Sequence, residues 1–95
     1  MVKPDKLDKY AIYMKITKKD LISLITNALE AENQITGESS MDNIPEWDSL
    51  GQLSVLTSLD HATEGRASLI SELGESTSVN KIFNVLKNAD LIDES

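Results

Sequence analysis

The chain has 95 residues, of which 40% are hydrophobic and 26% are charged, and its formal net charge is −7. This size and composition predict one small soluble domain with a packed core. The absence of cysteine excludes disulfides and thiolate metal sites. No apolar run approaches the roughly 20 residues of a membrane span, and the N-terminal residues do not resemble a signal peptide, so we expect a cytoplasmic protein.

The charges divide the chain into a basic N-terminal segment and an acidic remainder. Residues 1–19 contain six Lys and two Asp, a net charge of +4, whereas residues 20–95 contain three basic and fourteen acidic groups, a net charge of −11. An acidic body repels nucleic-acid phosphates and anionic lipids. We therefore expect protein partners with basic patches, although selection for solubility alone explains the same charge.

Residues 1–17 are predicted to form a basic N-terminal extension, because their apolar positions fit a helix face and a strand equally well. A helix is predicted to begin at Lys18, since Thr17 and Asp20 form a capping-box pattern and Ile16 can pack on Leu21. This helix should continue to about residue 31, because its apolar residues recur at helical spacing. They are Leu21, Leu24, Ile25, Ala28 and Leu29.

Residues 33–47 show neither a helical nor a strand period, which predicts a long loop. Its expected anchors are Ile35, Met41, Ile44 and Trp47. A second helix is predicted to start at Asp48 or Ser49 and to end before Gly65. Its apolar positions cover more than half of its circumference, so some of them must be exposed. Its other stripe contains small or weakly polar residues that would let a partner approach closely: Gly51, Ser54, Ser58 and His61.

The remaining pattern predicts a short third helix and a longer last one. Residues 67–73, followed by Gly74, suggest one or two helical turns, and Thr77 or Ser78 should cap the last helix. The expected core face of that helix is Val79, Ile82, Phe83 and Leu86. The predicted fold class is therefore all-α, a small four-helix bundle of three main helices and one short helix, with the folded domain at residues 18–92.

An independent catalytic function is not predicted. The single histidine and the absence of cysteine leave no metal-ligand spacing, and the four glycines are too dispersed for a phosphate-binding loop. Ser49 and His61 lie twelve residues apart on the same predicted helix, which separates them by about 18 Å. A catalytic dyad is therefore ruled out on a straight helix, and we expect neither an enzyme nor a metal site.

Ser49 lies where the long loop meets the second helix. A helix N-terminus offers unpaired N–H groups and the positive end of the dipole, so a phosphate attached there would be stabilised. In the alternative interpretation, Ser49 and Gln52 form a capping box and the serine only caps the helix. Asp48 is an equally good cap, and it would leave the Ser49 hydroxyl free.

The segment Asp48-Ser49-Leu50, placed after a Pro-containing loop and before an apolar helix, resembles the attachment motif of the acyl and peptidyl carrier proteins. The resemblance extends over about residues 18–90 and implies a bundle of acyl-carrier type. It also implies that a separate transferase moves 4′-phosphopantetheine from coenzyme A onto Ser49, with Asp48 and Leu50 flanking the cofactor. The thiol of this arm would hold acyl or aminoacyl groups as thioesters, which fits a chain without cysteine.

The longer segment from Trp47 to Gly51 is similar to that of discrete carriers outside core fatty-acid synthesis, for example those of surface-polysaccharide or secondary-metabolite pathways. The chain also departs from the usual pattern. The typical second helix is rich in Glu, whereas this one has Ser54, Ser58 and His61, and Thr63 replaces an expected bulky apolar residue. We therefore do not expect the usual fatty-acid enzymes as partners.

The resemblance places the partner surface at the start of the second helix. The expected partners are a phosphopantetheinyl transferase and enzymes that load or use the acyl group, with basic docking patches and no nucleic acid or membrane insertion; the chain itself should be a monomer. The expected contact residues are Glu46, Asp48, Leu50, Gly51, Leu53, Ser54, Asp60 and Glu64. The alternative function is an unmodified acidic helical adaptor that binds a protein partner, in which Ser49 only caps a helix.

Overall fold

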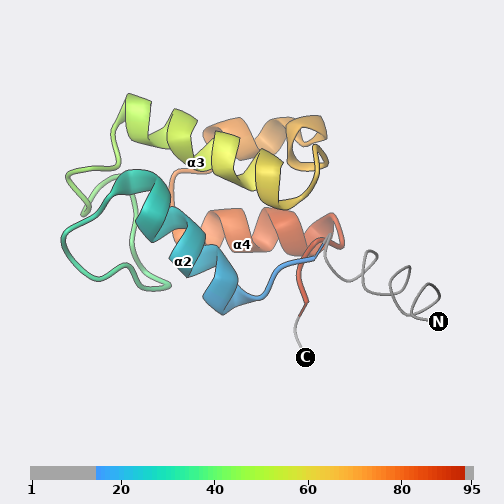
Figure 1. The fold of residues 1–95 in the computed structure, drawn as a ribbon, viewed down its shortest axis with the longest axis horizontal. Coiled ribbons are helices and arrows are strands. Elements are labelled where there is room, and N and C mark those ends of the chain that lie inside the picture. The colour runs from blue at the N-terminus through green and yellow to red at the C-terminus, as the bar shows by residue number, and fades with distance from the viewer. Residues whose placement is uncertain (1–14, 94–95) are drawn as a thin grey trace, which may run out of the picture.

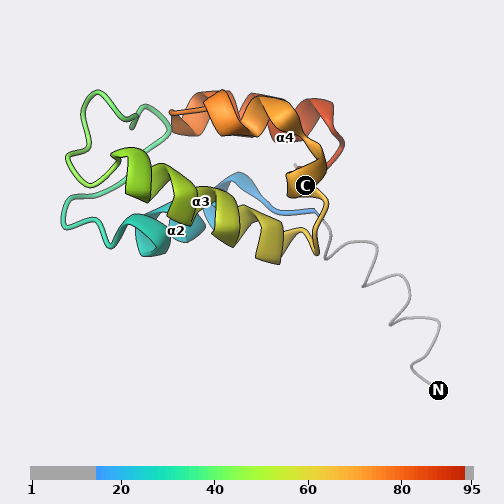
Figure 2. The same cartoon turned by 90° about the horizontal axis from the view of Figure 1, so that it is seen from above.

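The structure is a computed structural model that describes residues 15–93. Its helices are α2 (Lys18–Leu29), α3 (Ser49–Ala62) and α4 (Val79–Asn88), with two 3₁₀ turns, η1 (Ala67–Leu69) and η2 (Ser71–Glu75). Helices α2 and α3 lie side by side, α4 packs against α2 and η2, and the 3₁₀ turns connect α3 to α4 (Figures 1 and 2). Residues 15–93 contain no strand, so the predicted all-α class with a long loop between the first two helices is confirmed.

The folded body begins earlier than the predicted boundary at residue 18. Ile16 is buried, its N–H donates to the Leu91 carbonyl at 2.9 Å, and its carbonyl accepts from the Asp93 N–H at 2.9 Å. Lys15 adds an exposed ion pair with Asp90 at 3.2 Å. Ile16 therefore pairs with the C-terminal segment of the folded body, and Thr17 caps α2. Residues 1–14 and 94–95 lie outside the described part of the chain.

Local capping chemistry sets the helix limits. Thr17 Oγ1 accepts from the Asp20 N–H at 3.0 Å and Asp20 Oδ2 accepts from the Thr17 N–H at 3.3 Å, which completes the predicted capping box. Helix α2 ends at Leu29, two residues before the predicted limit, because Glu30 adopts a left-handed conformation with φ 50°. Of the two caps predicted for α4, Ser78 is the one that accepts, from the Lys81 N–H.

The core lies where the three helices face one another and extends under the long loop. Ile35, Ile44 and Trp47 are buried and Met41 is partly buried, so the predicted loop anchors are confirmed. The core face of α4 differs from the prediction at one position. Val85 is buried there, whereas Phe83 is only partly buried and its ring lies 5.2 Å from Lys18 Nζ in a cation–π contact.

The predicted short helix consists of two 3₁₀ turns separated by an extended residue, Ile70. Thr63, at the C-terminal end of α3, fixes where this segment begins. Its fully buried hydroxyl donates to the Leu59 carbonyl at 2.8 Å and accepts from the Ala67 N–H at 2.9 Å. A bulky apolar residue at this position would leave the Ala67 N–H without that acceptor. The hydrogen bonds of the hydroxyl therefore explain why a threonine stands at this position.

Candidate functional site

The candidate site is the junction of the long loop and α3. Ser49 is the first residue of α3 and is exposed. Asp48 is the N-cap, and its Oδ1 accepts from the Gly51 N–H at 2.8 Å. No hydrogen bond joins the Ser49 hydroxyl to another of residues 15–93, so Asp48 caps the helix and the interpretation of Ser49 as its cap is wrong. The helix thus presents an unengaged hydroxyl at its N-terminus.

A shallow hollow adjoins this hydroxyl. It measures about 510 Å³ and is lined by the loop from Met41 to Pro45 together with Trp47, Asp48 and Ser49. The loop keeps its shape through its own hydrogen bonds, since Asn43 Oδ1 accepts from the Ser40 N–H at 2.9 Å. A group attached to Ser49 would therefore lie beside an ordered surface that is partly apolar.

Gly51 holds α3 close to the loop and to α2. It is buried, and a Cβ at this position would collide with the Glu46 carbonyl oxygen and lie 2.8 Å from Leu29 Cδ2. The expectation that Gly51 contributes to an open partner surface is therefore wrong. Its lack of a side chain serves the packing of the molecule itself.

Gln52 connects three separate segments at the centre of the site. Its side chain is buried, its Oε1 accepts from Trp47 Nε1 at 2.7 Å, and its Nε2 donates to the carbonyls of Leu73 and Ser76 at 3.2 and 3.0 Å. The loop, α3 and η2 are thereby held together. Gln52 does not form a capping box with Ser49, and the sequence gives no signal for this role because its partners lie up to 24 residues away.

Glu46 makes a contact within the fold that the sequence did not predict. Its Oε2 accepts from the Glu32 N–H at 3.2 Å, and its Oε1 is buried with no hydrogen-bond partner among the described residues. The carboxylate therefore faces the chain that follows α2. Glu46 thus links the end of the loop to the chain after α2 and remains partly exposed, and its contact with a partner stays a prediction.

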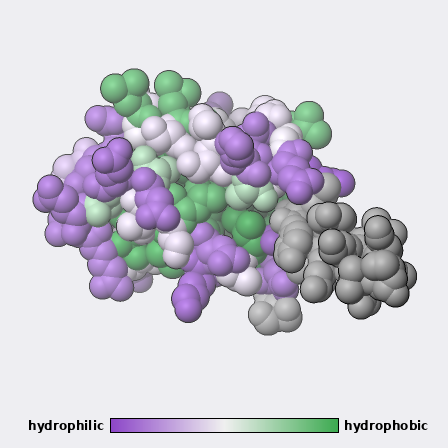
Figure 3. All heavy atoms as spheres, in the orientation of Figure 1, coloured by the Kyte–Doolittle hydropathy of each residue, from purple (hydrophilic) through white to green (hydrophobic). Residues whose placement is uncertain are grey.

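The exposed side of α3 next to Ser49 is apolar. Leu50 is 75% exposed and Leu53 is 60% exposed, and Ser54 is exposed beside them. Figure 3 shows hydrophobic side chains projecting from the surface over the first turns of α3. Leu50, Leu53 and Ser54 also line a shallow groove of about 430 Å³ that reaches Ala28 of α2. We call these three residues the α3 face.

The acidic residues expected at the partner surface are spread along the helix. Asp48 is exposed at the start of α3, Asp60 is partly buried near its end, and Glu64 is exposed beyond that end. Helix α3 is about 20 Å long. A partner centred on Ser49 therefore meets Asp48 first and reaches Glu64 only if it spans the whole helix.

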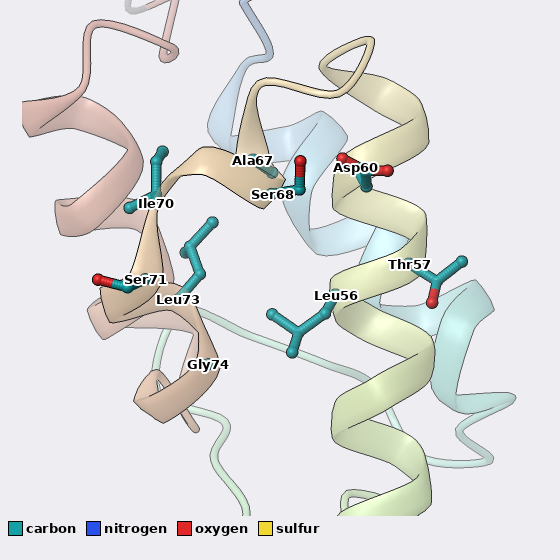
Figure 4. A pocket seen from close by; sticks show the side chains of 9 residues that line it. All are labelled: Leu56, Thr57, Asp60, Ala67, Ser68, Ile70, Ser71, Leu73 and Gly74. Carbon is teal, nitrogen blue, oxygen red and sulfur yellow. The ribbon is translucent and has the colours of Figure 1, made fainter.

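A second depression lies on another side of α3, between this helix and the 3₁₀ turns (Figure 4). It measures about 400 Å³. Leu56, Ala67, Ile70 and Leu73 form its apolar lining, and Thr57, Asp60, Ser68 and Ser71 contribute polar groups. We call it the α3–η cleft.

Comparison of the chain with protein-family models, with curated proteins and with solved structures found no match. Within residues 15–93, no helix is long and apolar enough to cross a membrane. The same part of the chain brings no three His, Asp or Glu side chains together as metal ligands. The class that these observations define is a small three-helix domain with a free serine hydroxyl at a helix N-terminus, beside an exposed apolar face.

Proposed function

We propose that the protein is an acyl carrier, with 4′-phosphopantetheine attached to Ser49. The observation that carries this proposal is that Asp48 and Ser49 have different roles at the start of α3. Asp48 caps the helix, which leaves the Ser49 hydroxyl exposed and unengaged. A serine that only stabilised the helix would use its hydroxyl as the cap.

The surroundings of Ser49 suit an attached phosphate. The Asp48 carboxylate at the N-cap accepts from the Gly51 N–H only, and the first turn of α3 adds no further acidic residue, which leaves the N–H groups of Ser49 and Leu50 for a phosphate. Unpaired N–H groups of the first turn point toward an anion held at this end. Among the residues that line the hollow beside Ser49, Met41 and Pro45 are at least partly exposed and offer apolar contacts for the arm.

In the proposed modification, Ser49 Oγ attacks the phosphorus atom of coenzyme A that carries the pantetheine arm. The Oγ–P bond forms as the bond to the leaving adenosine 3′,5′-bisphosphate breaks, and the hydroxyl proton passes to a base. His61 is about 18 Å away along the helix, so this base must come from a separate transferase. Once attached, the arm supplies a thiol that holds acyl or aminoacyl groups as thioesters.

The α3 face is the proposed docking surface for the transferase and for enzymes that load or use the acyl group. A group fixed to Ser49 can enter another active site only if the adjacent surface contacts that enzyme. Leu50 and Leu53 supply exposed apolar area there. Basic side chains on a partner would pair with Asp48 and, at a larger interface, with Asp60 and Glu64, chiefly raising the association rate.

Intact-mass measurement tests the modification. The purified chain is incubated with coenzyme A, Mg²⁺ and a broad-specificity phosphopantetheinyl transferase. We expect the mass of one phosphopantetheinyl group to be added to the wild type and to Ser23→Ala, which removes an exposed serine of α2, and no addition to Ser49→Ala. Addition to Ser49→Ala would refute the site. A wild-type chain that stays unmodified would favour the unmodified adaptor, which uses the same exposed face.

A further inference from the structure

The α3–η cleft combines an apolar lining with one carboxylate that lacks a donor. In Figure 4, Asp60 of α3 and Ser68 of η1 lie at one end of the cleft, and Leu56 and Leu73 lie further along it. Asp60 Oδ1 is buried and accepts no hydrogen bond from the described residues, and Asp60 forms no salt bridge with them. The Ser68 hydroxyl donates instead to the Gly65 carbonyl at 2.7 Å. A buried carboxylate oxygen without a donor is unfavourable, so the cleft favours an occupant that has a cationic donor and an aliphatic part.

The segment that precedes the described residues has this chemistry. Residues 1–14 contain three lysines and the apolar Leu7, whereas residues 20–95 carry a net charge of −11. The described chain begins at the end of the molecule where α3 and α4 end (Figures 1 and 2), and Ile16 pairs there with Leu91. Asp60 belongs to the last turn of α3. The N-terminal segment therefore joins the folded body at the same end at which the carboxylate lies.

We propose that the N-terminal segment, residues 1–14, binds the α3–η cleft of its own chain, with the Lys9 ammonium on Asp60. Lys9 precedes Lys15 by six residues, and six extended residues span up to about 20 Å. Side chains two residues apart in an extended segment point to the same side. Leu7 would then enter the apolar part of the cleft beside Lys9, while Asp8 faces solvent. Lys6 would share its side with Asp8, which makes Lys9 the better partner for Asp60.

The tether makes a weak contact sufficient. A short flexible linker gives an effective concentration of the order of millimolar, so a contact of millimolar affinity is occupied about half of the time. Lys9 is also the last lysine before Lys15, and the cost of closing a loop rises with its length. The docked segment would cover the Asp60 end of α3. A partner that spans the whole helix would have to displace it, and only this consequence rests on the proposed carrier function.

Reciprocal substitutions in the full, unmodified chain test the contact. Amide NMR signals of Ser68 and Gly74 report on the cleft, and the signal of Leu7 reports on the segment. Lys9→Gln should shift the two cleft signals, and Asp60→Ala should shift the segment signal, because each substitution removes one partner of the contact. Hydrogen bonds between charged groups correspond to a factor of about ten or more in an equilibrium constant. The ratio of docked to free segment should therefore fall about tenfold in each variant.

Two further variants control for charge alone. Lys6→Gln removes the same charge from the N-terminal segment, and Glu38→Ala removes an exposed acid from the long loop. Both should keep the ratio of docked to free segment within about twofold of the wild type. The proposal is overturned if Lys9→Gln leaves the cleft signals in place, or if Lys6→Gln shifts them as far as Lys9→Gln does. Lys9→Gln alters no described residue, so its result decides the test even if Asp60→Ala unfolds.

Dilution and the Ser49→Ala variant complete the test. Docking within one chain does not depend on its concentration, so tenfold dilution should leave the cleft signals unchanged. Signals that move on dilution toward their positions in Lys9→Gln would show that the segment binds a second copy, which overturns the proposal. Ser49→Ala cannot accept the arm and should show the same docking. Loss of docking and failure of the intact-mass test are therefore separate results, and neither decides the other.

Discussion

Replacing Gln52 by Leu tests whether the buried amide holds the loop, α3 and η2 together. The substitution keeps a side chain of similar size but removes three hydrogen bonds. The Leu73 carbonyl retains another donor, the Ser76 N–H at 3.0 Å. Two buried groups then lose the only partners found for them among the described residues, namely the Trp47 indole N–H and the Ser76 carbonyl.

The expected loss follows from those two groups. Leaving a buried donor or acceptor unsatisfied costs about 1–3 kcal/mol, so Gln52→Leu should lower the free energy of unfolding by about 2–6 kcal/mol. A small domain has only about 5–15 kcal/mol of stability in total. The variant should therefore fold with a clearly lower urea midpoint or lie close to unfolding at room temperature.

Urea unfolding followed by the fluorescence of Trp47, the only tryptophan, measures this loss. The matched control is Gln34→Leu, because Gln34 is exposed in the same long loop and should change stability by less than about 0.5 kcal/mol. A double-mutant cycle with Trp47→Phe isolates the indole hydrogen bond, for which we expect a coupling of about 1 kcal/mol. All four proteins of the cycle are followed by helical circular dichroism, because the Trp47→Phe variants lack the tryptophan. A loss below about 1 kcal/mol for Gln52→Leu, or one equal to that of the control, would contradict the bridging role.

The helix limits could be predicted because their causes are local. The hydroxyls of Thr17 and Ser78 cap N–H groups three residues further along the chain, and so does the carboxylate of Asp48. Such contacts depend only on residue type and spacing, which the sequence displays. At the start of α3 the sequence offered two adjacent candidates, and the choice of Asp48 became clear only from the geometry.

The interior of the site could not be predicted because its contacts are distant in sequence. Gly51 and Gln52 follow Ser49 in the same helix, but their contacts lie far away in the sequence. Gly51 packs closely against Leu29, and the Gln52 amide donates to the carbonyls of Leu73 and Ser76. Helical periodicity indicates how much of a face is apolar, but a small or amide residue fits a buried and an exposed position equally well. For this reason the predicted stripe of small exposed residues wrongly included Gly51, which is buried.

Three further tests address the start of α3, and the first two use thermal or urea unfolding. Ser49→Ala should change stability little, whereas Asp48→Ala should cost about 1 kcal/mol, and the reverse order would contradict the assignment of the cap. Gly51→Ala should lower the free energy of unfolding by about 1–3 kcal/mol, because the added Cβ meets backbone and a packed side chain. Gly74→Ala is the control, because the space around Gly74 is open, and it should not cause this loss. Equal losses for the two variants would contradict the packing role of Gly51. Leu53→Glu tests the docking surface. Because the Leu53 side chain is 60% exposed, the helical circular dichroism and the unfolding midpoint of the variant should stay close to those of the wild type. The added charge should nevertheless slow transfer onto Ser49, since it places a solvated carboxylate in the apolar centre of the proposed interface. An unfolded variant would place Leu53 in the core, and a folded variant modified at the wild-type rate would move the docking surface away from the α3 face.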